Sequence, residues 1–205
     1  MTIMTNRNIM TSDEKIMTND WVSAHLAGAQ VPFSFIFGGR HSSNFIHTWQ
    51  RQETTRQLTN QRMEHVIRFT DPVSGLVVRC VAITYNDFPV VEWTLYFSNT
   101  GNANSPIIES IRALDWTIRN PPPSSGSASE FILNYHIGSP TKPEDYRPLI
   151  SVLKPNSNTR IATSGGRPSN AHLPYFNLEW AGGGTILAIG WSGQWATEFV
   201  RDPAN

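Results

Sequence analysis

The stretch Val91-Glu92-Trp93-Thr94-Leu95-Tyr96-Phe97 alternates between apolar residues and residues that carry a polar group. Side chains of a β-strand point to opposite faces in turn, so Val91, Trp93, Leu95 and Phe97 share one face. The pattern predicts a strand that turns one face towards a hydrophobic core.

Similar short segments recur on both sides of this strand. Gly, Pro, Asn and Asp stand between them, and these residues adopt the backbone angles that turns require. The strands that we expect cover residues 34–37, 45–52, 54–59, 65–70, 76–85, 90–99, 107–118, 131–135, 175–180 and 185–191. Many short strands with frequent turns predict an all-β fold, a two-sheet antiparallel β-sandwich. Residues 107–118 also permit the apolar spacing of a helix, although we favour a strand there.

The composition excludes several classes of partner. The 205 residues include 16 basic and 16 acidic ones, so no excess positive charge is present for a nucleic acid or an acidic membrane surface. No run of 18 apolar residues occurs, and the N-terminus lacks the apolar core of a secretory signal. We therefore expect neither nucleic acid nor membrane as a partner, and cytoplasmic localisation by default.

The N-terminus differs in composition from the rest. Ile-Met-Thr occurs at residues 3–5, 9–11 and 16–18. The opening resembles a reporter leader of cloning vectors, so residues 1–24 are expected to be a disordered or vector-derived leader, with an amphipathic helix as the alternative. Residues 25–205 are expected to form one domain, and the Pro-rich and Ser-rich residues 120–129 a long loop within it. Cys80, the only cysteine, lies in an apolar run and is expected to be buried.

The C-terminal half combines aromatic and polar residues in turn-rich surroundings. Sugar recognition uses aromatic platforms together with planar hydrogen-bonding groups. The residues of these types that we consider candidates for substrate binding are Asp145, Arg167, Asn170, Trp191 and Trp195. Ties between loops are the competing explanation for the same residues. No Gly-x-Ser-x-Gly elbow, metal-ligand spacing or phosphate loop is present, so we expect no metal and no cofactor.

Five segments in order carry a family resemblance. They are residues 136–140 (His-Ile-Gly-Ser-Pro), 145–149 (Asp-Tyr-Arg-Pro-Leu), 164–169 (Ser-Gly-Gly-Arg-Pro-Ser), 173–178 (Leu-Pro-Tyr-Phe-Asn-Leu) and 182–195, which ends Gly190-Trp191-Ser192-Gly193-Gln194-Trp195. They resemble the N-terminal β-supersandwich of family-36 glycoside hydrolases, the α-galactosidases. Upstream, residues 33–39 and 87–93 fit the same region, so the resemblance covers about residues 25–200.

The resemblance implies a galactose-mutarotase-like sandwich that precedes a catalytic barrel. In the family that barrel carries both catalytic aspartates, and its Lys-Trp-Asp motif does not occur here, so no catalytic residue is transferred to this chain. We expect the sandwich to be truncated at its C-terminal end. The family domain can lend an aromatic side chain to the sugar pocket, for which Trp49 is a further candidate beside Trp191 and Trp195.

Two functional interpretations follow. The first is a non-catalytic, carbohydrate-associated domain or fragment of an α-galactosidase-like enzyme, with a galactoside as a partner, packing against a barrel, and homo-oligomerisation. The second is a stand-alone hydrolase, a glycosidase or an esterase, with its site in a surface cleft or dimer interface.

Overall fold

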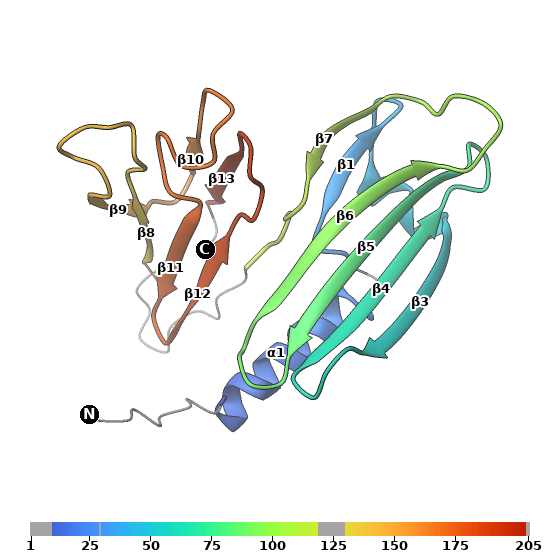
Figure 1. Cartoon of the computed structure of the whole chain (residues 1–205), viewed down its shortest axis with the longest axis horizontal. Coiled ribbons are helices and arrows are strands. Elements are labelled where there is room, and N and C mark those ends of the chain that lie inside the picture. Colours follow the sequence, from blue (N-terminus) through green and yellow to red (C-terminus); the bar gives the residue numbers. More distant parts are fainter. Residues whose placement is uncertain (1–9, 29, 119–129, 204–205) are drawn as a thin grey trace. The chain divides into compact units, whose positions relative to one another are not determined.

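The computed structural model describes residues 10–28, 30–118 and 130–203, and most regular structure there is β-strand (Figure 1). The chain divides into two compact units, residues 1–117 and 118–205. Each unit has its own hydrophobic core. The sequence, by contrast, predicts a single domain over residues 25–205. The loop expected at residues 120–129 lies outside the described residues.

Unit 1 holds one α-helix, two short 3-10 helices and seven described strands. The strands are β1 (Ser34–Phe37), β2 (Arg40–His41), β3 (Gln50–Gln57), β4 (Arg62–Thr70), β5 (Leu76–Tyr85), β6 (Val91–Asn99) and β7 (Ile108–Arg112). They form two antiparallel sheets, ordered β3-β4-β5-β6 and β2-β1-β7.

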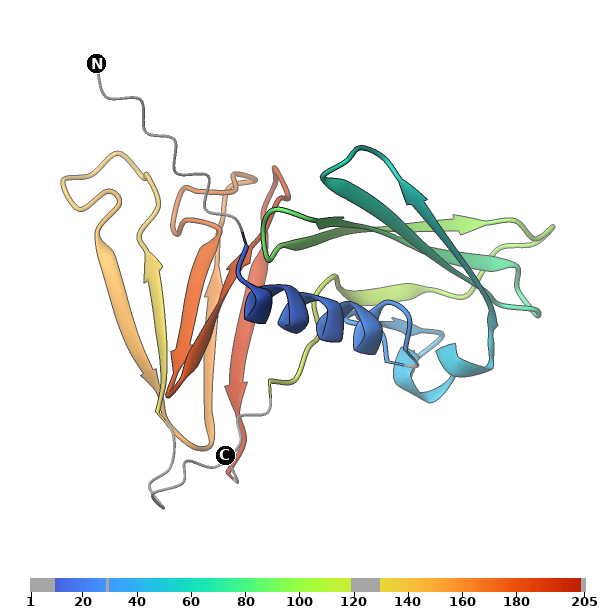
Figure 2. The ribbon, with the colours of Figure 1, turned by 90° about the horizontal axis from the view of Figure 1, so that it is seen from below.

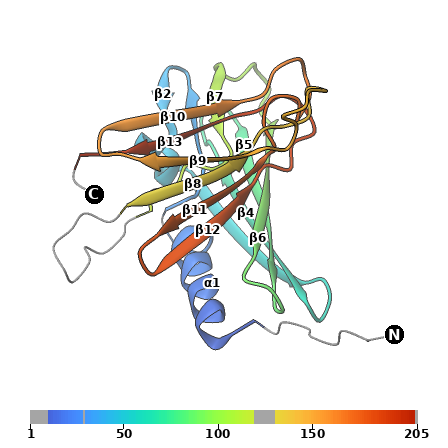
Figure 3. The same cartoon turned by 90° about the vertical axis from the view of Figure 1, so that its left-hand side faces the viewer.

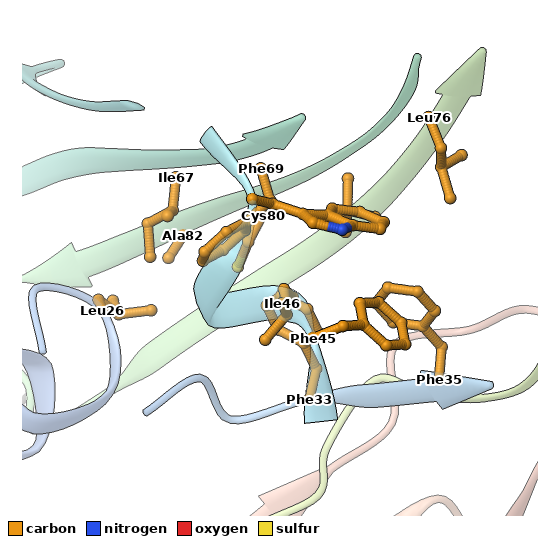
Figure 4. Packing of buried hydrophobic residues seen from close by; sticks show 12 residues of the cluster. Leu26, Phe33, Phe35, Phe45, Ile46, Ile67, Phe69, Leu76, Cys80 and Ala82 are labelled. Carbon is orange, nitrogen blue, oxygen red and sulfur yellow. The ribbon is translucent and has the colours of Figure 1, made fainter. Parts of the chain in front are cut away.

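The core of unit 1 lies between these two sheets. Phe35 of β1 is fully buried, and the centroid of its ring lies 5.4 Å from that of Phe97 of β6. Ile67, Phe69, Val78 and Cys80 lie in the same buried cluster (Figure 4). The core face predicted for Val91, Trp93, Leu95 and Phe97 is confirmed, since all four pack against this cluster. Cys80 is buried as predicted, and burial raises the pKa of its thiol to about 12.

A helix occupies most of the expected leader. The helix α1 (Ser12–His25) begins with a capping box, in which the Thr11 hydroxyl accepts from the Glu14 amide and the Glu14 carboxylate accepts from the Thr11 amide. Trp21 stacks on Trp93 of β6, with the ring centroids 5.4 Å apart, which ties the helix to the sheet of unit 1. Figure 2 shows α1, in blue, beside the strands of this unit. The expectation of disorder is therefore wrong for residues 12–24, and the alternative of a helix agrees with the structure. No helix among the described residues is long and apolar enough to cross a membrane.

Unit 2 holds six described strands, each of six residues. They are β8 (Phe131–His136), β9 (Pro148–Leu153), β10 (Ser157–Ala162), β11 (Tyr175–Trp180), β12 (Gly183–Ala188) and β13 (Ala196–Arg201). Four form an antiparallel sheet, ordered β12-β11-β8-β9, and β10 pairs with β13 (Figure 3). A second hydrophobic cluster fills the interior of unit 2. In it, the ring centroids of Phe176 of β11 and Phe199 of β13 lie 5.4 Å apart.

The all-β class and the antiparallel sandwich are thus confirmed, and three details differ. Residues 42–48 form two 3-10 helices, η1 (Ser42–Asn44) and η2 (Ile46–Thr48), where a strand is predicted from residue 45. Phe45 and Ile46 are nevertheless buried, because a 3-10 turn can also direct apolar side chains to the core. Strand β7 is shorter than the predicted 107–118, and β2, β9, β10 and β13 are not predicted.

Candidate functional site

The three long connections of unit 2 lie at the same end of the unit. Successive strands run in opposite directions, so every second connection lies at the same end of the unit. Residues 137–147 link β8 to β9, residues 163–174 link β10 to β11, and residues 189–195 link β12 to β13. Among the described residues, the connections at the opposite end are short turns, at residues 154–156 and 181–182 (Figure 3). We call residues 137–147, 163–174 and 189–195 the loop end.

Hydrogen bonds join the three loops to one another. Gly138 N donates to Ala171 O at 2.9 Å, and Ser139 N donates to Ser169 O at 2.7 Å. Trp195 provides the second link, because its indole Nε1 donates to Pro168 O at 2.7 Å. The backbone contact at Gly138 is close, since a Cβ added there would lie 2.0 Å from Ser169 O. The first two loops can therefore meet only if residue 138 is glycine.

An open pocket of about 430 Å³ lies in the first loop. This volume falls within the range of roughly 300–1,000 Å³ that is common for small-molecule sites. The residues that line it are Ile137, Pro140, Lys142, Glu144, Asp145 and Arg147. Lys142, Glu144 and Arg147 are exposed, so the pocket offers two cationic side chains and one carboxylate to a ligand.

Asp145 has a structural role in this loop. Its carboxylate accepts hydrogen bonds from Ser139 Oγ at 2.9 Å, from Lys142 N at 3.0 Å and from Thr141 N at 3.2 Å. Three donors occupy most of the acceptor positions of the carboxylate. Asp145 therefore fixes the shape of the pocket wall, as the competing explanation from the sequence anticipates.

Two residues of the pocket loop adopt a backbone conformation that side chains disfavour. Thr141 has φ of 70° and Tyr146 has φ of 64°. A non-glycine residue in this region costs of the order of 1 kcal/mol, and such residues cluster at functional sites. Tyr146 is 58% exposed and stands in the chain between Asp145 and Arg147, which line the pocket. Sequence reasoning did not single out Tyr146, although its place between Asp145 and Arg147 is the signal that could have found it.

The other candidates in the loop end differ in accessibility. Trp191 is 66% exposed, and its ring edge lies over Gly193, where a Cβ would come within 2.7 Å of the indole Nε1. Arg167 is exposed, and Asn170 Oδ1 accepts from Ser164 N at 3.3 Å. Trp191 and Arg167 are thus available to a ligand, whereas Asn170 is partly engaged within its loop.

Trp195 and Trp49 are buried. Trp195 lies in the core of unit 2, 5.7 Å from the ring of Phe176. Trp49 lies in the core of unit 1, with its ring centroid 5.2 Å from that of Phe45. Neither ring offers an open face for stacking, so both stabilise their cores. The structure brings together Asp145, Arg167, Asn170, Trp191 and Trp195 in one set of loops and leaves Trp49 outside it.

Comparisons with known proteins add no family to this picture. No family model, no curated protein and no solved structure matches the chain. The resemblance to family-36 glycoside hydrolases remains a prediction. Among the described residues, no group of three or more His, Cys, Asp or Glu side chains is arranged to hold a metal ion.

Proposed function

We propose that the loop end of unit 2 binds a saccharide without cleaving it, in keeping with an accessory domain of an α-galactosidase-like glycoside hydrolase. The observation that carries the proposal is the exposure of Tyr146 and Trp191 on two loops of the loop end, the first of which also holds the open pocket. Flat aromatic faces stack on the apolar face of a sugar ring.

The polar groups of the loop end suit hydroxyl groups. Lys142 and Arg147 can donate hydrogen bonds, and Glu144 can accept them. Side chains of these types orient a neutral sugar that an aromatic platform holds in place. The exposed Arg167 adds a further donor on the second loop.

Catalysis has less support than binding. A glycosidase needs two carboxyl groups, roughly 5 to 9.5 Å apart on either side of the scissile bond. Glu144 and Asp145 both line the pocket, but three hydrogen bonds from its own loop hold the Asp145 carboxylate, so Glu144 is the one exposed acid among the lining residues. The stand-alone hydrolase is therefore the weaker of the two interpretations. Self-association of the chain and packing against a catalytic barrel remain predictions.

The proposal is tested by titrating the chain with galactose and with α-galactosides, followed by calorimetry and by tryptophan fluorescence. We expect saturable binding without turnover, and we expect Trp191→Ala to weaken it about tenfold, which corresponds to about 1.4 kcal/mol. Phe88→Ala is the matched control, because it removes an aromatic ring that is 51% exposed on unit 1. It should leave the affinity unchanged.

Two results would overturn the proposal. If Trp191→Ala and Phe88→Ala bind the sugar equally well, the loop end is not the binding surface. If the chain hydrolyses an aryl α-galactoside and substitution of Glu144 abolishes the turnover, the site is catalytic.

A further inference from the structure

The outward face of the larger sheet of unit 1 carries a second polar arrangement. The strand register places Gln52 of β3, Arg68 of β4, Arg79 of β5 and Tyr96 of β6 opposite one another in a single row. Their neighbours along the strands alternate into the core, so this row lies on the face away from the core. Arg79 and Tyr96 are exposed, and Arg68 is half-buried.

The two arginines of this row are neighbours across two strands, and no carboxylate of the described residues forms an ion pair with either of them. Arg68 and Arg79 are directly paired across β4 and β5, and like charges in that position destabilise a sheet. Arg68 Nε donates to Thr70 Oγ1 at 3.5 Å, and the guanidinium carbon of Arg79 lies 4.6 Å from the centre of the Tyr96 ring. Neither arginine forms an ion pair within the described part of the chain.

Within the described sheet, the two rows beside the pair contain no acidic residue. The adjacent rows on this face contain only Thr, Val, Gln and Ser: Thr54, Val66, Val81 and Thr94 on one side, and Gln50, Thr70, Val77 and Ser98 on the other. The carboxylates of the next row are already engaged. Glu64 accepts from Arg56 at 2.9 Å, and Glu92 accepts from the Tyr85 hydroxyl at 2.8 Å. Uncharged side chains, three of them valines, thus flank two cations that lack a counter-charge.

We propose that Arg68 and Arg79 together bind an oxyanion, the phosphate or sulfate group of a small ligand. Directly opposed residues have Cβ atoms about 5 Å apart, a separation at which two guanidinium groups can both reach one tetrahedral anion. Guanidinium donates several hydrogen bonds in a fixed plane and pairs with such anions through two of them at once. The Arg79 guanidinium lies over the ring of Tyr96 on β6, on the side of β5 away from Arg68, so Arg79 has to turn from this ring to share an anion with Arg68.

The bound anion also removes the repulsion between the arginines. The like-charge pair costs stability in the free protein and becomes favourable only when an anion lies between its members. The site belongs to unit 1, so it is independent of the saccharide proposal for unit 2.

The test is a titration of the whole chain with inorganic phosphate and inorganic sulfate, with sodium chloride holding the ionic strength constant. Binding is followed by the NMR signals of the arginine Nε–H groups and by the temperature of unfolding. We expect a saturable response that centres on Arg68 and Arg79. The double variant Arg68→Gln, Arg79→Gln should lose at least about tenfold in affinity.

The matched control is Arg56→Gln. It removes the same charge from the same face of the sheet, but from an arginine that Glu64 already neutralises. Its anion affinity should change by less than about twofold. Without anion, the double variant should be at least as stable as the parent, which separates lost binding from lost folding. Arg79→Lys, which keeps the charge and loses the planar fork, should also bind more weakly.

Two results would overturn the proposal: a response that rises linearly without saturation, or equal losses in Arg56→Gln and in the double variant. A monosaccharide phosphate and a monosaccharide sulfate are titrated in parallel. Tighter binding of either ester than of the inorganic ion identifies a sugar ester as the ligand, and equal binding identifies the free ion.

Discussion

The two units build the same kind of antiparallel sandwich with different proportions of strand and loop. In unit 1, β4, β5 and β6 have nine or ten residues each, and short turns join them. In unit 2 every described strand has six residues, and the loops at 137–147 and 163–174 are longer than the strands that they join. In unit 1 the solvent-facing side of the long sheet offers the larger surface for binding. In unit 2 the loops offer it, because the strands are short.

The difference also determines what holds functional groups in place. Arg68 and Arg79 are positioned by strand register, which the buried face fixes through Phe69, Val78 and Cys80. The pocket of unit 2 is positioned by individual hydrogen bonds between loops, such as that from Ser139 N to Ser169 O. Unit 1 should therefore depend mainly on its core, and the loop end mainly on a few backbone contacts.

The largest effect is expected in the core of unit 1. Phe35→Ala removes a fully buried ring that meets Phe45, Trp49 and Phe97, and it should lower the free energy of unfolding by about 3–5 kcal/mol. Urea unfolding measures this loss. The buried Cys80 thiol gives a second measurement, because a thiol reagent labels it only after unit 1 opens, and labelling should accelerate in the variant.

Phe88→Ala provides the control for this prediction. Its ring is 51% exposed, so the loss should stay within about 0.5 kcal/mol and Cys80 labelling should keep the rate of the parent. Equal destabilisation by the two substitutions would contradict a core centred on Phe35.

A smaller effect is expected where two loops of unit 2 touch. Gly138→Ala places a Cβ 2.0 Å from Ser169 O, so the loops must separate, at a cost of about 1–3 kcal/mol. Hydrogen exchange at the Ser139 amide, which donates to Ser169 O, should become faster. Gly190→Ala is the control, because nothing lies within 4 Å of a Cβ added there. If both variants exchange at the same rate, the close approach at Gly138 does not hold the loop end together.

The same contrast explains how far the sequence predicts the fold. In β5, residues 76–85 are predicted with the observed bounds, because a long apolar run between turn residues has one interpretation. In β10 and β13 burial alternates along the strand, but the residue types do not: β10 includes Arg160, and β13 includes Glu198 and Arg201, so the sequence signal is weak. The sequence signal for β9 is also weak, because the strand begins at Pro148 and proline is more common in turns than in strands.

The candidate site is predicted in location but not in the roles of its residues. Residue type marks Trp191 and Trp195 as equivalent, and only the fold shows that one ring is exposed and the other is buried. Asp145 shows the same limit, because its three donors lie in a loop whose conformation requires positive φ at Thr141 and Tyr146. A single sequence does not predict such a conformation in residues other than glycine.

The smallest effect is expected at the turn between β4 and β5, where unit 1 uses a carboxylate as unit 2 uses Asp145. Burial acts to raise the pKa of Asp71, but hydrogen bonds from the Ser74 hydroxyl and from the Val73 and Ser74 amides outweigh it and hold the pKa below its usual 3.8. A lowered pKa in the folded state gives stability that is complete above pH 3.8 and is lost as the pH falls through the folded value. Asp71→Asn should therefore be less stable than the parent by about 1 kcal/mol near neutral pH, and the difference should shrink as the pH falls below 3.8. Urea unfolding of both proteins across this range measures the difference, and a gap that stays constant with pH would show that the Asp71 charge does not stabilise the turn.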